Sequence, residues 1–145
     1  MKKVFKLYTD GACKGNPGPG GWGVFIEGVC KEEIQLSGYE SLTTNNRMEI
    51  KAAIMGLLYF KEKADIKIYT DSNYLKLGIT EWIKKWKQNG WKNSNRKEVS
   101  NKDLWIELDS LNSFHNVKWH WVKAHNGNVG NEKADSLACN AIEEN

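Results

Sequence analysis

Strand-like and helix-like segments follow one another in an order that restricts the possible folds. The strand-like runs are residues 4–9, 22–26, 32–39, 65–70 and 117–121. A loop rich in Gly and Pro, residues 14–21, and a further turn join the first three runs, which predicts an antiparallel meander. Helical segments precede the fourth and fifth runs, so these can pair in parallel with the first. We therefore expect an α/β protein with a five-stranded mixed sheet, in which strands one, four and five are parallel.

The first helix is predicted by a cluster of residues that favour helix N-termini. Asn46, with Glu49 three positions later, resembles a capping box, so a helix is expected from there to about Lys63. By the 3.6-residue period, Glu49 shares a face with Ala53 and Gly56. Such small residues would let the helix lie close to the sheet and bring Glu49 to it.

The remaining helices are expected later in the chain. Helical patterns occupy residues 74–78, 81–88 and 103–111. Asn131 can cap a last helix, which carries Asp135 on a face with Ala138 and Ile142. This helix would bring a second carboxylate against the sheet.

The length and composition are those of an ordinary globular protein. At 145 residues and 40% hydrophobic content, residues 1–145 fit a single domain. No apolar run approaches the roughly 20 residues that a membrane span needs. We therefore expect a cytoplasmic protein with no membrane partner.

The three cysteines do not form a recognisable framework. Cys13, Cys30 and Cys139 are an odd number, widely spaced and without a C-x-x-C pair. This pattern argues against disulfides and against a zinc site. We expect buried, reduced thiols.

Positive charge is concentrated in one segment. Residues 81–102 carry Lys84, Lys85, Lys87, Lys92, Arg96, Lys97 and Lys102. Set against Glu81 and Glu98, the segment has a net charge of 7 − 2 = +5, while the whole chain is +3 and the remainder is therefore 3 − 5 = −2. Such a patch predicts a docking surface for a polyanion.

Four carboxylates occupy positions that suggest chemistry. Asp10 and Asp71 each follow a strand of the predicted parallel set, and chemistry gathers at such strand ends. Glu49 and Asp135 lie on helix faces that are otherwise small or apolar. A carboxylate that faces a core must be paired or bound to metal, and no matching set of cations is patterned here. Oxygen ligands alone favour Mg²⁺ or Mn²⁺ over zinc.

Sequence blocks around these carboxylates resemble a known family. Residues 9–21, 44–49, 69–74, 121–125 and 130–135 are similar to the signature blocks of type 1 ribonuclease H. The blocks occur in order, and the resemblance extends over nearly the whole chain. The resemblance implies the ribonuclease H-like fold, with helices on both faces of the mixed sheet.

The resemblance also implies an activity. The family's enzymes are endonucleases that cleave the RNA strand of an RNA/DNA hybrid with two Mg²⁺ ions, which Mn²⁺ can replace, and leave 5′-phosphate and 3′-hydroxyl ends. By motif match, Asp10 bridges both ions, and Glu49, Asp71 and Asp135 share the remaining positions.

His125 is a further catalytic candidate. It lies between the fifth strand and the Asp135 helix, where the family histidine assists proton transfer or product release. Ala124 stands where the family usually has Gly, so the loop conformation is less certain. A solvated loop histidine is the alternative interpretation.

The resemblance assigns hybrid binding to two groups of residues. The first group, beside the carboxylates, is Gly11, Cys13, Gly15, Asn16, Thr44, Asn45, Asn46 and Asn73. The second group, on a protruding basic handle at about residues 81–102, is Trp82, Lys84, Lys85, Trp86 and Lys87. Helix capping and turn formation are alternative roles for Thr44 and the asparagines. Core packing is the alternative for the two tryptophans, and solvation for the lysines. Trp105, Trp119 and Trp121 are expected in the core by their spacing.

Three other functions compete with this interpretation. A DNA-acting nuclease of the same fold would lack the Gly-Asn-Pro-Gly turn and the Thr-Asn-Asn block. A non-catalytic hybrid-binding module would lose carboxylates, and all four are present. A phosphatase would need a D-x-D-type nucleophile after the first strand, which is absent. We expect a monomer without an obligate protein partner.

Overall fold

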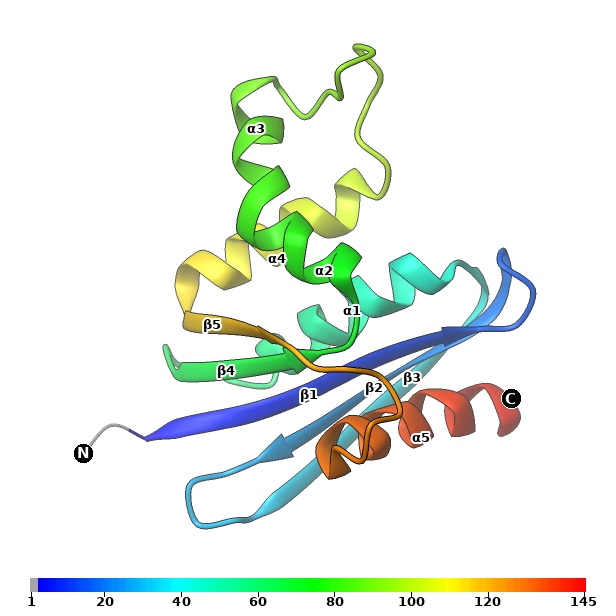
Figure 1. The fold of residues 1–145 in the computed structure, drawn as a ribbon, viewed down its shortest axis with the longest axis vertical. Helices are drawn as coiled ribbons and strands as arrows, with labels where there is room; N and C mark the ends of the chain where they lie inside the picture. Colours follow the sequence, from blue (N-terminus) through cyan, green and yellow to red (C-terminus); the bar gives the residue numbers. More distant parts are fainter. Residues whose placement is uncertain (1–2) are drawn as a thin grey trace.

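The strands form one mixed sheet. The structure is a computed structural model that describes residues 3–145. Its strands are β1 (Val4–Cys13), β2 (Gly18–Glu27), β3 (Glu33–Thr43), β4 (Asp65–Thr70) and β5 (Asn116–Trp121), in the order β3-β2-β1-β4-β5 (Figure 1). β2 pairs antiparallel with β1 and β3, whereas β1–β4 and β4–β5 are parallel. The predicted topology is confirmed.

The helices cover both faces of this sheet. They are α1 (Asn45–Leu58), α2 (Asn73–Leu77), α3 (Ile83–Gln88), α4 (Lys102–Phe114) and α5 (Val129–Glu143). A π-helical turn, Gly78–Trp82, joins α2 to α3, so the two predicted short helices run on without a break. α1 lies on the face that bears Leu7 and Val24, since a Cβ on Gly56 would lie 2.9 Å from the first and 3.2 Å from the second. α5 lies on the opposite face (Figure 1). Among the described residues, no helix is long and apolar enough to cross a membrane.

The first hairpin is longer than predicted. β1 continues through Asp10 to Cys13, so the expected loop of residues 14–21 shrinks to residues 14–17. The glycines that suggested a turn have another role. A Cβ at Gly21 or Gly23 would lie 2.3–2.4 Å from a backbone carbonyl of α5. These glycines therefore allow α5 to pack closely on β2.

Two predicted helix caps are wrong. Thr44, not Asn46, caps α1, and its side chain accepts a hydrogen bond of 3.2 Å from the Arg47 amide. The helix also ends at Leu58, short of the predicted end. Asn128 caps α5 and accepts from the amide of Asn131, which is itself buried. In both cases several neighbouring residues can cap, and tertiary contacts select among them.

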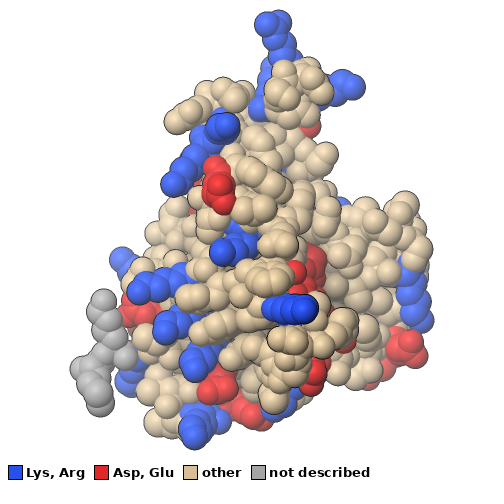
Figure 2. Space-filling model, in the orientation of Figure 1, with Lys and Arg blue, Asp and Glu red and all other residues tan. Residues whose placement is uncertain are grey.

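The basic segment projects from the body of the molecule. α3 and the loop after it rise above the sheet, with Lys and Arg side chains at the tip (Figures 1 and 2). At its base, the rings of Trp82, Trp86 and Trp105 form a chain with centroid separations of 6.0 and 5.5 Å. Trp105 is fully buried, Trp86 is half-buried and Trp82 is exposed. Packing thus accounts for Trp86, as the alternative interpretation expected.

Two burial predictions are wrong. Trp121 is 44% exposed, because it lies at the end of the edge strand β5, while Trp119 is half-buried. Cys30 and Cys139 are exposed and Cys13 is half-buried, although all three are free thiols as expected. Cys30 lies in the turn between β2 and β3, and Cys139 is on the outer side of α5, so neither meets the core.

Candidate metal centre and its relatives

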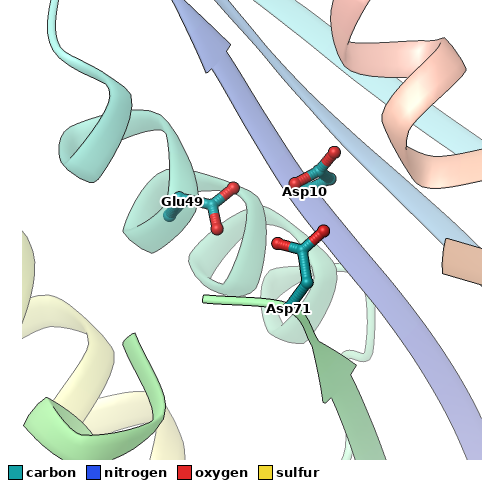
Figure 3. A group of neighbouring side chains, drawn as sticks. All are labelled: Asp10, Glu49 and Asp71. Carbon is teal, nitrogen blue, oxygen red and sulfur yellow. The ribbon is translucent and has the colours of Figure 1, made fainter. Parts of the chain in front are cut away.

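Three carboxylates meet at one point of the sheet. Asp10 lies in β1, Glu49 in the second turn of α1, and Asp71 directly after β4 (Figure 3). One carboxylate oxygen from each lies within 4.8 Å of the other two. Asp10 is 6% exposed and Glu49 3% exposed, so water solvates them poorly.

Strand pairing places the two aspartates. The parallel register of β1 and β4 ends at the pair Thr9 and Thr70. The strands separate immediately beyond it, and Asp10 and Asp71 occupy the next positions. Both carboxylates therefore stand at the carboxyl end of the parallel pair, where α/β folds place their chemistry.

Gly11 brings the helix to this point. Its backbone amide donates a hydrogen bond to Oε1 of Glu49. A Cβ at Gly11 would lie 2.5 Å from backbone atoms of Met48 and Glu49, closer than real Cβ atoms approach. Only glycine allows β1 and α1 to lie at this separation, which sets the position of the Glu49 carboxylate.

The pKa of each of the three carboxyl groups is raised, and burial is the largest cause in every case. Burial is the largest cause for Asp10, followed by the charge of Glu49 and its hydrogen bond. Burial also raises the pKa of Glu49 and of Asp71. None of the four ion pairs found within residues 3–145 neutralises any of the three. A dry cluster of like charges with only oxygen donors fits a hard divalent cation.

Asp135 and His125 lie at the rim of this cluster. Asp135, on α5, is half-buried and stands outside the tight group, but its side chain is near enough to Asp10 to add to the rise in the pKa of that group. His125 is exposed in the loop before α5, with a left-handed backbone (φ 54°). Burial has the largest effect on the pKa of Asp71, followed by the side chain of Asn131 and the charge of Asp135. The charge of His125 has a smaller effect, which lowers this pKa. The predicted catalytic residues are thus neighbours, three of them tightly grouped.

Two polar residues beside the cluster were not predicted. Asn131 is 2% exposed, and its side chain beside Asp71 opposes the rise in the pKa of that carboxyl group. Ser72 caps α2 and also contacts the Glu49 side chain. Both lie inside the sequence blocks quoted for the carboxylates, which was the available signal. The position of Asn131 before a helix predicts only a cap.

The predicted hybrid-binding residues near the carboxylates fall into one cluster and one separate residue. The Asn16 side chain accepts a hydrogen bond of 2.9 Å from the Asn45 amide, which ties the β1–β2 turn to the start of α1. Cys13 Sγ lies 3.5 Å from the carbonyl of Thr43 in the same region. Gly11, Gly15, Thr44 and Asn46 belong to these two segments. Asn73 is exposed on the other side of the cluster, at the start of α2.

The handle lysines differ in their contacts. Lys84 and Lys85 are exposed, and neither belongs to the ion pairs found among the described residues. Lys87 instead pairs with Asp109 of α4, with an Nζ–Oδ2 distance of 3.1 Å. Lys87 therefore helps to hold α3 to α4.

A family model for RNase H matches residues 2–143. The chain belongs to the RNase H family. It is 63% identical over 139 residues to the ribonuclease H of Francisella philomiragia subsp. philomiragia, covering 94% of this chain and 90% of that protein. The ribonuclease H of Francisella tularensis subsp. novicida matches to the same extent. The chain is therefore a ribonuclease H enzyme, as the sequence blocks predicted.

Solved RNase H structures share the fold. LC9-RNase H1, described as a type 1 RNase H with the type 2 active-site motif, superposes with a TM-score of 0.88 at 31% identity, over 99% of this chain and 74% of that one. LC11-RNase H1 in complex with an RNA/DNA hybrid gives a TM-score of 0.68 at 26% identity, over 97% of each chain. The expected ribonuclease H-like fold is confirmed.

Proposed function

We propose that this RNase H hydrolyses the RNA strand of RNA/DNA hybrids with two Mg²⁺ ions held by Asp10, Glu49, Asp71 and Asp135. The observation that carries the proposal is the convergence of three carboxylates, two of them buried, that take part in none of the ion pairs found within residues 3–145. RNase H enzymes use divalent metal ions, and Mg²⁺ suits a site built from oxygen donors alone. When bound, the ions supply an activated water and stabilise the charge that develops on the leaving 3′ oxygen.

The protein groups orient the ligands and move protons. Asp10 would hold the ions together with Glu49 and Asp71, with which it is tightly grouped, and Asp135 would complete the set. The Asn131 amide orients Asp71, and the Gly11 amide orients Glu49. His125, at the rim, accepts or delivers a proton near the scissile phosphate.

The hybrid is proposed to lie across two surfaces. The β1–β2 turn and the start of α1, with Asn16, Thr44 and Asn45, face the minor groove and a DNA-strand phosphate, while Asn73 contacts the hybrid from the start of α2. Lys84 and Lys85 of the handle contact further phosphates, and the exposed ring of Trp82 packs beside them. The complex of LC11-RNase H1 with an RNA/DNA hybrid supports this substrate class. The enzyme is proposed to work as a monomer and as a single domain.

The test is cleavage of matched duplexes. We expect Mg²⁺ to support cleavage of RNA in an RNA/DNA duplex, with 5′-phosphate and 3′-hydroxyl ends, but no cleavage of RNA/RNA or DNA/DNA. Asp71→Asn should nearly abolish cleavage and leave the circular dichroism spectrum unchanged. Cleavage of DNA/DNA would instead favour a DNA-acting nuclease, and binding without cleavage a non-catalytic module.

Mn²⁺ and oligomeric state are tested separately. All metal ions are first removed with EDTA, and Mn²⁺ is then added in place of Mg²⁺. Cleavage under these conditions shows whether Mn²⁺ can replace Mg²⁺. Light scattering coupled to gel filtration gives the mass of the particle in solution. A mass of twice 16.6 kDa would overturn the monomer prediction.

A further inference from the structure

The sheet face opposite α1 is only partly covered. α5 packs mainly on β1, β2 and β3, and leaves β4 and β5 open on its side of the sheet (Figure 1). The parallel register sets Tyr8, Tyr69 and His120 side by side across β1, β4 and β5. Their rings stack with centroid separations of 4.9 and 5.0 Å. The open strands therefore carry a continuous row of half-buried aromatic rings.

A row of lysines lies beside these rings. Lys6, Lys67 and Lys118 are partners in the same register, two residues before each ring, and so point to the same face. Like charges directly opposite one another destabilise a sheet. None of the three takes part in the four ion pairs found among residues 3–145. The amines of Lys67 and Lys118, together with Lys76, add to burial in lowering the pKa of His120.

The acidic groups near this row leave a positive surface at β4 and β5. Glu27 of β2 is the register partner of Lys6 and can neutralise it. Asp65 lies at the start of β4, where its Oδ1 accepts a hydrogen bond of 2.6 Å from Asn116. Lys67 and Lys118 therefore carry the unbalanced charge, beside a small hollow of about 70 Å³ at the starts of β1, β4 and β5. Figure 2 shows Lys and Arg side chains gathered over this part of the sheet.

The same face leads directly to the carboxylates. Asp10 and Asp71 stand two residues beyond Tyr8 and Tyr69 along their strands. Lys6 precedes Asp10 by four residues, or roughly 13 Å at the rise of a β-strand. At about 3.4 Å per nucleotide, that span corresponds to about four nucleotides of one strand. Lysines, rings and metal ligands thus lie in order along one surface.

We propose that this surface, the lysine–aromatic face, binds single-stranded RNA that continues from the scissile strand beyond the end of the hybrid. The face consists of Lys6, Lys67, Lys118, Tyr8, Tyr69 and His120. Lysines contact phosphates without regard to sequence, and His120, the last ring of the row, can stack with a base through the ring face that Tyr69 does not cover. Basic groups beside an aromatic ring are the usual combination in proteins that bind single strands. RNA is the occupant because, in the proposed function on which this inference rests, the RNA strand passes Asp10 and Asp71.

The test compares a blunt hybrid with extended hybrids. Binding is followed by fluorescence anisotropy in EDTA, which prevents cleavage, with a short RNA extension at the 5′ or the 3′ end of the RNA strand. One of the two RNA extensions should tighten binding about tenfold at 50 mM salt. Two added phosphate contacts, from Lys67 and Lys118, at about 0.7 each for single strands, should steepen the salt dependence by about 1.4 log units. An extension of the DNA strand should add little.

The variant Lys67→Gln/Lys118→Gln should lose most of this gain while binding and cleaving the blunt hybrid normally. The matched control is Lys51→Gln/Lys61→Gln, in α1 and the turn after it, which removes the same charge from the other side of the sheet and should keep the gain. The inference is overturned if wild type shows no gain, if the double variant keeps it, or if a DNA extension gives the same gain. Failure of the proposed function would appear separately, as uncleaved blunt hybrid in Mg²⁺.

Discussion

The indole Nε1 of Trp121 donates a hydrogen bond of 3.1 Å to the backbone carbonyl of Asp71. This bond joins the end of β5 to the residue that follows β4, directly at the carboxylate cluster. The largely exposed ring otherwise contributes little to the core, so its main effect is to fix the backbone that carries one metal ligand.

Trp121→Phe should therefore weaken metal binding. Groups that orient metal ligands typically contribute 10–100-fold in affinity or activity, and we expect roughly a tenfold rise in the Mg²⁺ dissociation constant measured by calorimetry. The control is Trp119→Phe, which removes an indole hydrogen bond of 2.9 Å to Asn112, away from the carboxylates. Equal metal affinities in the two variants would contradict a positioning role for Trp121.

Asp10→Asn should abolish cleavage but stabilise the metal-free protein. The substitution removes one charge from a poorly solvated cluster of like charges, whose cost appears in the raised pKa of Asp10. We expect the free energy of unfolding in urea, at neutral pH with EDTA, to rise by about 1–3 kcal/mol. Saturating Mg²⁺ should narrow the difference, because the ion neutralises the wild-type cluster. A less stable metal-free variant would count against the electrostatic account of this site.

Gly11→Ala should disturb both stability and the metal centre. The added methyl group would meet the backbone of α1, so we expect a loss of about 1–3 kcal/mol together with weaker Mg²⁺ binding. Gly15→Ala is the comparison, because Gly15 has a positive φ of 64° but a Cβ there would meet only the Pro17 carbonyl oxygen, at an ordinary contact distance of 3.7 Å. That variant should lose only about 1 kcal/mol and keep its metal affinity. Unchanged Mg²⁺ binding in the Gly11 variant would show that Glu49 is positioned by other contacts.

The handle lysines should differ in their effect on hybrid binding, because only Lys87 is in an ion pair. Lys84→Gln/Lys85→Gln should weaken hybrid binding and reduce the salt slope by almost 2 log units, at about 0.9 per phosphate contact. Lys87→Gln should change the slope less, since its amine is paired with Asp109, and should lower the melting temperature slightly. Titrations of binding against salt concentration separate these effects. An unaltered slope in the double variant would remove the handle from the binding surface.

Acid should destabilise the fold through His115. This residue is 4% exposed, and its two ring nitrogens contact the backbone of Ala64 at 3.1 Å and of Leu57 at 3.2 Å. Burial, opposed by the hydrogen bond to Leu57, lowers the pKa of His115, so the folded protein holds a neutral ring that the unfolded chain protonates near pH 6.5. Stability should accordingly fall as pH decreases below about 6.5, by at most about 1.4 kcal/mol per pH unit.

The role of His115 is checked by comparing how steeply the unfolding free energy depends on pH in the wild type and in a variant. His115→Asn should be less stable at neutral pH but should show a shallower dependence of unfolding free energy on pH between about 6.5 and 5. Identical slopes in wild type and variant would show that other groups cause the loss of stability in acid.

The sheet and the metal ligands could be predicted because each lies in a segment with a clear pattern. Asp10 and Asp71 follow strand-like runs, and Glu49 lies on a helix face of small residues. The predictions that are wrong, such as the helix caps, concern features that depend on contacts between distant segments. Four successive residues at positions 43–46 can cap a helix, and the bond between Asn16 and the amide of Asn45 helps to set which one does.

The predicted burial of Trp121 on the edge strand β5 is wrong for a similar reason. Alternation in β5 shows which side chains share a face, but not whether another element covers that face at Trp121. The glycines of β2 likewise suggested a turn, because a sequence does not show that α5 needs the space a side chain would fill.

The three grouped carboxylates come from separate segments of the chain, so folding is needed to bring them together. Asp10 and Asp71 are 71 − 10 = 61 positions apart, with Glu49 between them, so the unfolded chain offers no comparable site. An ion that binds only the folded state stabilises it by RT ln(1 + [Mg²⁺]/Kd), about 2.7 kcal/mol at a hundred times Kd. The ion concentration that sets catalytic turnover therefore also sets how long the folded enzyme resists unfolding and proteolysis.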